Sequence, residues 1–166
     1  MRLLAVVGHS DSGKTRLIQR LIPVFKARGL SVAVIKHCHR GFDWAPRGKD
    51  SARFLEAGAD GVGLWSPDYR AALFRVTGEA DVPEWISRQF GDRDVVLIEG
   101  GKGLRGVPKI EVRRHASGEA LDIPAEEIRA LVTEGSVREG VPHFPPHRID
   151  DLADFLLDAG EEGGWN

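Results

Sequence analysis

The sequence Gly8-His9-Ser10-Asp11-Ser12-Gly13-Lys14-Thr15 decides the fold, and it follows directly on the apolar residues 3–7. It matches the pattern G-x-x-x-x-G-K-[ST] of a phosphate-binding loop. In such a loop the backbone N–H groups face the α- and β-phosphates, and the lysine reaches the β- and γ-phosphates. We therefore expect all eight residues to bind a nucleotide, with Lys14 as a catalytic charge and Thr15 as a Mg²⁺ ligand.

The residues on either side of this loop predict a strand before it and a helix after it. Apolar residues recur at helical spacing over residues 17–25, so the positive end of a helix would face the phosphates. Further apolar runs predict strands at 30–35, 94–99, 109–112 and 128–132, and amphipathic patterns predict helices at 81–90 and 150–157. The alternation predicts an α/β fold, P-loop NTPase-like, with a mostly parallel sheet, flanking helices and a ligand at the carboxyl ends of the strands.

A hairpin pattern interrupts this alternation. Residues 61–65 and 71–76 are apolar runs on either side of a turn that contains Pro67 and Asp68. These runs carry more large apolar side chains than a small isolated hairpin can shield from water. The side chains are those of Leu64, Trp65, Leu73 and Phe74. We therefore predict a homodimer built partly on residues 62–76, the alternative being burial under the helix at 85–90 of the same chain.

Length and composition restrict the class of protein. A chain of 166 residues suits one nucleotide-binding domain over residues 1–160, with a frayed tail at 161–166. Cys38 is the only cysteine, so an intrachain disulfide is impossible and we expect a reducing, cytoplasmic location. We expect no membrane span, because no apolar run reaches about 20 residues. The net charge of −2 argues against nucleic-acid binding.

Glu99 is the second candidate site residue. It ends the apolar run 94–99, so the strand would deliver its carboxylate to the edge of the sheet beside the phosphate loop. In phosphate-loop enzymes an acid at this place holds the metal, directly or through water. We predict a catalytic and Mg²⁺-binding role for Glu99, the alternative being a glutamate that only faces water.

A basic segment, Lys36-His37-Cys38-His39-Arg40, follows the second predicted strand. It suits the γ-phosphate or a second phosphorylated ligand. The candidate donors are Lys36, His37, His39, Arg40, Arg47 and Lys49. A soft-metal site on the two histidines and the cysteine, or a solvated loop, are the alternatives.

Nucleotide hydrolysis is expected to be slow. No arginine finger and no glutamine placed to orient water is recognisable in the sequence. The pair Arg113-Arg114 is the nearest candidate for a kinase-like lid, but we expect it to continue the strand predicted from residue 109.

Several segments together resemble the molybdopterin-guanine dinucleotide biosynthesis protein B family. Besides the phosphate loop they are Val34-Ile35-Lys36-His37 with His39, Gly48-Lys49-Asp50-Ser51, Val96-Leu97-Ile98-Glu99-Gly100 with Lys102, and Pro108-Lys109-Ile110-Glu111-Val112. The resemblance extends from residue 1 to about residue 157.

This resemblance implies a GTP-binding accessory protein of molybdenum cofactor maturation, a slow Mg²⁺-dependent GTPase and a homodimer. The implied partners are molybdopterin or its guanine dinucleotide, and the enzyme that joins GMP to molybdopterin. The residues by themselves indicate only a Mg²⁺-dependent nucleotide-binding α/β protein. They leave open a small-molecule kinase and a nucleotide-gated adaptor without functional hydrolysis.

Overall fold

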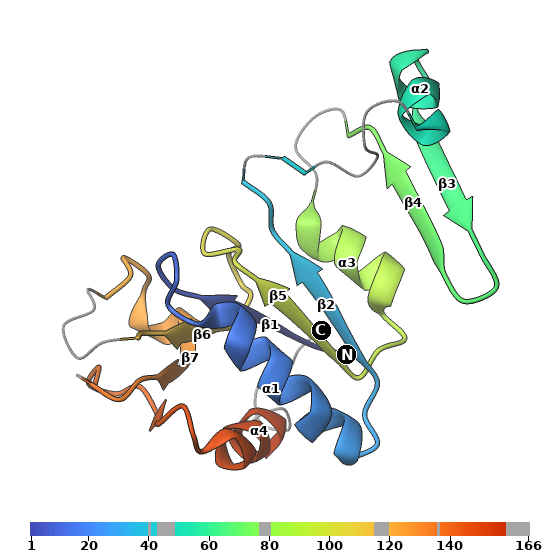
Figure 1. Ribbon diagram of the computed structural model, residues 1–166. Helices are drawn as coiled ribbons and strands as arrows, with labels where there is room; N and C mark the ends of the chain where they lie inside the picture. Colours follow the sequence, from blue (N-terminus) through green and yellow to red (C-terminus); the bar gives the residue numbers. More distant parts are fainter. Residues whose placement is uncertain (40, 43–48, 77–80, 115–119, 136, 159–166) are drawn as a thin grey trace. The chain divides into compact units, whose positions relative to one another are not determined.

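The computed structural model describes residues 1–39, 41–42, 49–76, 81–114, 120–135 and 137–158. The chain divides into two compact units, one formed by Met1–His37 with Val82–Asn166 and the other by Cys38–Asp81 (Figure 1). The single domain predicted over residues 1–160 stays a prediction, and the tail at 161–166 lies outside the described residues.

The first unit contains a six-stranded sheet. Its strands are β1 (Arg2–Val7), β2 (Val32–Lys36), β5 (Val95–Glu99), β6 (Lys109–Val112), β7 (Ile128–Val132) and β8 (His143–Phe144). They lie in the order β2-β5-β1-β6-β7-β8, and every neighbouring pair is parallel. The predicted P-loop NTPase-like α/β fold is confirmed. Because the strands are parallel, their carboxyl ends meet at one edge of the sheet.

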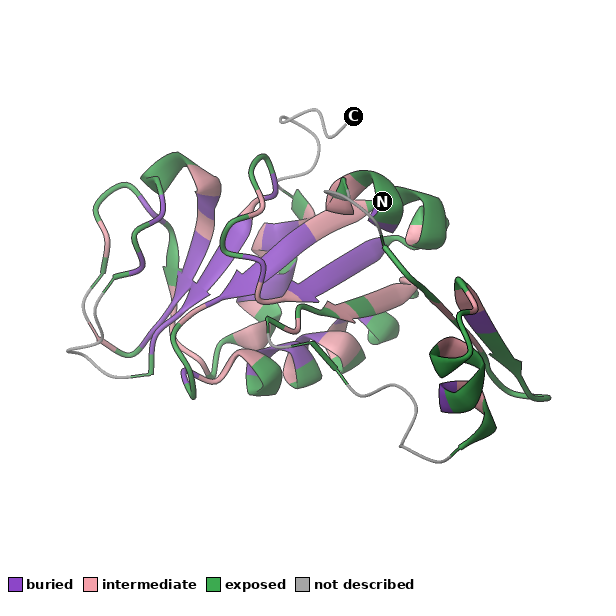
Figure 2. Ribbon diagram, turned by 90° about the horizontal axis from the view of Figure 1, so that it is seen from above, coloured by how far each residue is buried: buried purple, intermediate pink, exposed green. Residues whose placement is uncertain are grey.

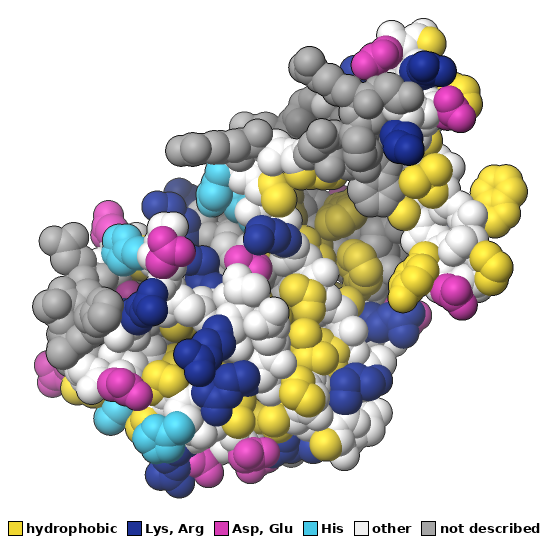
Figure 3. Space-filling model, viewed as in Figure 1, with side chains coloured by type: hydrophobic (Ala, Val, Ile, Leu, Met, Phe, Trp, Pro, Cys, Tyr) yellow, Lys and Arg dark blue, Asp and Glu magenta, His cyan; other side chains and the backbone are white. Residues whose placement is uncertain are grey.

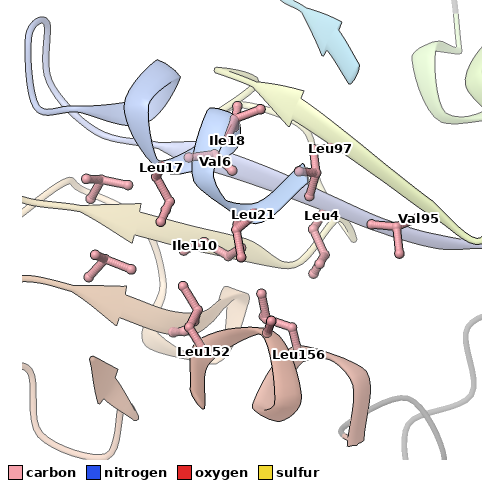
Figure 4. Close-up of a cluster of buried hydrophobic side chains, with 14 of the residues drawn as sticks. Leu4, Val6, Leu17, Ile18, Leu21, Val95, Leu97, Ile110, Leu152 and Leu156 are labelled. Atoms are coloured by element: carbon pink, nitrogen blue, oxygen red, sulfur yellow. The ribbon is translucent and has the colours of Figure 1, made fainter. Parts of the chain in front are cut away.

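Helices α1 (Lys14–Ala27) and α4 (Ile149–Asp158) cover one face of this sheet. Leu4 and Val6 of β1 point toward this face, where Leu21 of α1 and Leu152 and Leu156 of α4 meet them (Figure 4). Each fully buried leucine of this kind contributes about 1.5–3 kcal/mol to stability through burial alone.

The opposite face of the sheet packs against helix α3 (Val82–Phe90) and against loop residues. Ile86 of α3 is fully buried and packs with the alternate side chains of the strands, among them Ala5, Val96 and Ile98. In Figure 2 most residues of the central strands have the colour of buried residues, and successive residues of a strand face opposite sides of the sheet. This burial explains why residues 95–98 are continuously apolar instead of alternating. A short 3₁₀ helix, η1 (Ala125–Glu127), leads into β7.

The second unit contains helix α2 (Asp50–Glu56) and the strands β3 (Gly61–Trp65) and β4 (Arg70–Phe74). The two strands form the predicted antiparallel hairpin, with Val62 opposite Leu73 and Trp65 opposite Arg70. Val62 is buried and α2 contacts β3, so the face that carries Val62 and Leu73 is the covered one.

The other face of the hairpin is apolar and exposed. Trp65 and Phe74 lie on it and are 87% and 67% exposed. Gly61 makes room there for the Phe74 ring, since a Cβ on Gly61 would lie 2.8 Å from Phe74 Cδ1. No helix in the described ranges is long and apolar enough to cross a membrane.

Candidate functional site

A cavity of about 1030 Å³ opens at the carboxyl edge of the six-stranded sheet. The phosphate loop, the first turns of α1 and the ends of β2, β5, β6 and β7 line it. Six of its lining side chains are Lys or Arg and three are Asp or Glu. In Figure 3, Lys and Arg side chains gather over the first half of α1. This excess of positive charge favours an anionic ligand.

Gly8 lies in the phosphate loop at a place where no side chain fits. A Cβ on Gly8 would lie 2.5 Å from the carbonyl oxygen of Val112, and closer still to the hydroxyl oxygen of Ser12. Asp11 has φ 58 and Gly13 has φ 102, so the loop turns twice through the left-handed region before α1 begins. The loop therefore wraps tightly against the end of β6.

Donors converge on the inside of this loop. The Lys14 ammonium donates hydrogen bonds of 3.1 and 2.6 Å to the carbonyl oxygens of Gly8 and His9. The first N–H groups of α1 have no partner within the helix, and the helix dipole makes this end positive. The Ser12 hydroxyl oxygen is buried and has no hydrogen-bond partner within the described part of the chain. Such a cradle fits the oxygens of a di- or triphosphate.

Thr15 and Glu99 form an oxygen-rich pair at the rim of the cradle. The Thr15 hydroxyl donates a hydrogen bond of 2.9 Å to Oε1 of Glu99. The Lys36 ammonium lies 3.7 Å from the same oxygen, and the Glu99 side chain is only 16% exposed. One hydroxyl and one carboxylate beside a phosphate cradle fit Mg²⁺, which takes few protein ligands and completes its shell with phosphate oxygens and water.

A soft-metal site on His37, Cys38 and His39 gains no support. The described residues contain no cluster of three or more His, Cys, Asp or Glu side chains that would hold a metal. The backbone N–H of His37 donates to the carbonyl oxygen of Glu99 at 3.0 Å, which fixes the end of β2 against β5. A Cβ on Gly100 would lie 3.3 Å from the Cβ of His37, so the two strand ends approach closely.

The structure brings most of the predicted site residues together. Residues 10–15, Lys36 and Glu99 line the cavity, while Gly8 and His9 hold the Lys14 ammonium. His39 and Lys49 belong to the second unit, and Arg40 and Arg47 lie outside the described residues. A joint site of the basic segment and the phosphate loop therefore stays a prediction.

The cavity also contains residues that the sequence did not reveal as site residues. Besides the apolar Leu17, Val112 and Val132, they are Arg16, Gln19, Arg20, Arg113, Arg114, Glu134, Pro146 and His147. The expectation that Arg113 and Arg114 lie within a strand is wrong, because β6 ends at Val112 and both arginines follow it into the cavity. Their position directly after the apolar run 109–112 could have indicated a place in the site, just as the position at the end of an apolar run indicated Glu99.

Arg113 is held by a buried carboxylate. Its Nε and Nη2 donate to the two oxygens of Glu111 at 2.9 and 3.0 Å, and the backbone N–H of Leu121 donates to the same carboxylate at 3.0 Å. Arg113 is 7% and Glu111 1% exposed. A bidentate pair of this kind fixes the end of β6 rigidly.

The cavity-lining residues have a clear order along the carboxyl edge. Lys36 ends β2 and Glu99 ends β5, and the phosphate loop follows β1. On the other side of β1, Arg114 follows β6 and Glu134 follows β7. A nucleotide that placed its γ-phosphate and a metal at the β5 side would place its nucleoside at the β6–β8 side.

The parallel sheet, the phosphate loop and its rim define a P-loop NTPase-like α/β protein. The family model described as molybdopterin guanine dinucleotide synthesis protein B matches residues 3–134. The chain belongs to this family.

Two relatives carry the name molybdopterin-guanine dinucleotide biosynthesis adapter protein. The one from Haemophilus influenzae is 36% identical over 93% of this chain and 86% of its own length. The one from Escherichia coli is 32% identical over 94% of this chain and 91% of its own length. A solved structure of molybdopterin-guanine biosynthesis protein B is 32% identical, with a TM-score of 0.72 over 95% of this chain and 97% of that chain.

Proposed function

We propose that this chain binds GTP together with Mg²⁺ and acts as an adapter in the biosynthesis of molybdopterin guanine dinucleotide. The observation that carries the proposal is the hydrogen bond between Thr15 and Glu99 beside the Lys14 ammonium. This bond holds the Glu99 carboxylate against the Thr15 hydroxyl, so the two oxygens proposed to bind Mg²⁺ lie together beside the phosphate cradle. The names of the relatives from H. influenzae and E. coli support the adapter role.

Each residue of the cradle has a chemical task in this proposal. Lys14 neutralises charge on the β- and γ-phosphates, and the N–H groups at the start of α1 hold the phosphate oxygens. Thr15 and Glu99 are the residues that would hold Mg²⁺. When it is bound, this ion neutralises phosphate charge. Hydrolysis is slow in this proposal. The bound nucleotide therefore acts mainly as a signal that controls the binding of a partner.

Guanine is the preferred base. Glu134 lies at the nucleoside side of the cavity and carries an exposed carboxylate. A carboxylate only accepts hydrogen bonds. Guanine offers N–H donors at N1 and at its 2-amino group, whereas adenine presents a lone pair at N1. Glu134 therefore favours GTP over ATP, and Glu134→Gln should reduce the ratio of GTP to ATP affinity.

The basic segment serves a second phosphorylated ligand, either molybdopterin or its dinucleotide product. Its donors are Lys36, His37, His39, Arg40, Arg47 and Lys49. His37→Ala and Lys49→Ala should weaken the function linked to that ligand more than they weaken GTP binding. Equal losses for both ligands would show that the segment serves only the nucleotide.

A second copy of the chain packs on the exposed face of the β3–β4 hairpin. Trp65 and Phe74 present an apolar surface there that a two-stranded hairpin cannot shield by itself. A twofold contact would bury both copies of this face.

A reconstituted assay tests the adapter role. The enzyme that joins GMP to molybdopterin is supplied with its substrates, and dinucleotide formation is measured with and without this chain. We expect wild type with GTP and Mg²⁺ to increase product formation, and Lys14→Ala to give no increase. An increase of equal size from both proteins would contradict a nucleotide-dependent adapter.

A further inference from the structure

We propose that Arg114 binds the nucleotide from its nucleoside side, at the α- and β-phosphates, and does not act as an arginine finger on the γ-phosphate. This inference rests on the proposed function, since it requires a nucleotide in the cavity. It assigns a binding task to a residue that the phosphate-loop pattern does not include.

Arg114 is aimed at the phosphate loop by a rigid support. It follows Arg113, whose guanidinium is locked to the buried Glu111 carboxylate. The backbone is fixed as well, because the N–H of Arg113 donates to the carbonyl oxygen of Val132 at 2.9 Å. The backbone at Arg114 therefore has a defined position at the carboxyl edge of the sheet, and the side chain extends from there toward the phosphate loop.

The present partner of Arg114 is weaker than a phosphate. Its Nη1 donates to the carbonyl oxygen of Asp11 at 3.3 Å, and the side chain is exposed and lines the cavity. A guanidinium bonds a phosphate oxygen more strongly than a neutral carbonyl, because both partners are then charged. The contact with Asp11 shows that the guanidinium reaches the middle of the phosphate loop.

The strand order decides which phosphates Arg114 meets. Thr15, Glu99 and Lys36 mark the metal and γ-phosphate side, at β5 and β2. Arg114 follows β6, on the opposite side of β1. From there it contacts the part of the ligand that GDP and GTP have in common.

Binding of GDP and of the non-hydrolysable analogue GppNHp, each with Mg²⁺, tests this assignment by calorimetry. We expect Arg114→Gln to bind both nucleotides about tenfold more weakly, an effect of about 1.4 kcal/mol. Arg114→Lys, which keeps the charge, should lose less. Glutamine keeps an N–H group that can donate to the Asp11 carbonyl oxygen. A loss of nucleotide affinity in Arg114→Gln therefore reports the missing charge and not a changed shape of the phosphate loop. Arg93→Gln, at the amino end of β5, is the matched control and should bind like wild type.

Two results would overturn the inference while leaving the proposed function intact. Wild-type affinity of Arg114→Gln for both nucleotides would reduce Arg114 to a support of the loop. A loss confined to GppNHp would place Arg114 at the γ-phosphate. If wild type binds neither nucleotide, the proposed function is overturned and the inference falls with it.

Discussion

Thr15, at the start of α1, and Glu99, the last residue of β5, share a hydrogen bond of 2.9 Å although they are 84 positions apart in the sequence. The parallel pairing of β1 with β5 creates this relationship, because Val6 lies in register with Glu99. The strand that precedes the phosphate loop thus aligns the acid with the first turn of the helix.

Glu99→Gln should remove most of the Mg²⁺-dependent part of nucleotide binding while leaving the fold intact. An amide keeps an oxygen for the Thr15 hydroxyl but lacks the charge that a hard cation favours. GTP affinity is measured with Mg²⁺ and with EDTA, and Glu126→Gln in η1 is the control because its side chain is exposed outside the cavity. An unchanged gain in affinity from Mg²⁺ would leave Glu99 as a residue that only ends a strand.

Hydrolysis of GTP by the isolated protein should be slow, on the order of 10⁻³ s⁻¹ or below, as for GTPases without an arginine at the γ-phosphate. Both arginines that line the cavity after β6 lie on the side of β1 away from Glu99. Charge that develops on the γ-phosphate then meets Lys14, Lys36 and the metal, but neither of these two arginines. A multiple-turnover assay of phosphate release measures the rate, and turnover of several per second would refute this prediction.

The exposed hairpin face should hold the homodimer together. Trp65→Glu or Phe74→Glu places a charge in the proposed contact, so light scattering at micromolar concentration should report monomers. Tyr69→Glu is the matched control, because Tyr69 is 80% exposed but lies in the turn between the strands. A monomeric wild type would reject the dimer, and a dimer that tolerates both charges would place the interface elsewhere.

Asp94 should make stability depend on pH in the acid range. The Ser31 backbone N–H donates to its carboxylate at 2.8 Å and the Ser31 hydroxyl at 2.7 Å, and these bonds lower the pKa of Asp94 below its ordinary value of about 3.9. A carboxyl whose pKa is lower in the folded state stabilises the protein at neutral pH. This contribution is lost as the pH falls through the lowered value.

Asp94→Asn should therefore lower the free energy of unfolding at pH 7, and its difference from wild type should shrink as the pH falls below about 4. Urea unfolding of both proteins at several pH values measures this. Asp92→Asn serves as the control, because Asp92 is an exposed neighbour in the same turn. A difference that stays constant down to pH 3 would show that the Asp94 charge is not involved.

Local patterns in the sequence predicted the strands and helices of the sheet unit well, because each has a long apolar run or a clear helical period. The exception is β8, which contains only His143 and Phe144. The surrounding prolines indicate a loop, and this strand exists only because β7 offers it a partner. Pairing between distant segments is a tertiary effect that no local pattern contains.

Two charged residues show the same limit. Lys109 is fully buried, and its ammonium donates to the carboxylate of Glu127 and to the carbonyl oxygens of Leu104 and Val107. Glu111 is buried against Arg113. Such charges inside a strand are tolerated only when other groups satisfy them. Part of this satisfaction comes from Glu127 and from the backbone N–H of Leu121, 18 and 10 positions away, which no local pattern contains.

The hairpin sequence contains a pattern that separates its two faces. The prediction of one apolar surface on the hairpin combines Leu64 and Leu73 with Trp65 and Phe74. Adjacent residues of a strand point to opposite faces, and the observed register puts the two leucines on the face opposite to that of Trp65 and Phe74. The alternation of the strand was sufficient to separate these two faces.

Titration of GTP into the protein in the presence of Mg²⁺, with wild type and Lys14→Ala side by side, tests the nucleotide-binding proposal most directly. Wild type should bind, and loss of the ammonium should weaken binding by about 2–3 kcal/mol, or roughly 30- to 150-fold. Lys26→Ala, in the last turn of α1, is the matched control and should bind like wild type. Equal GTP affinity of wild type and Lys14→Ala would contradict the assignment of this cavity as a nucleotide site.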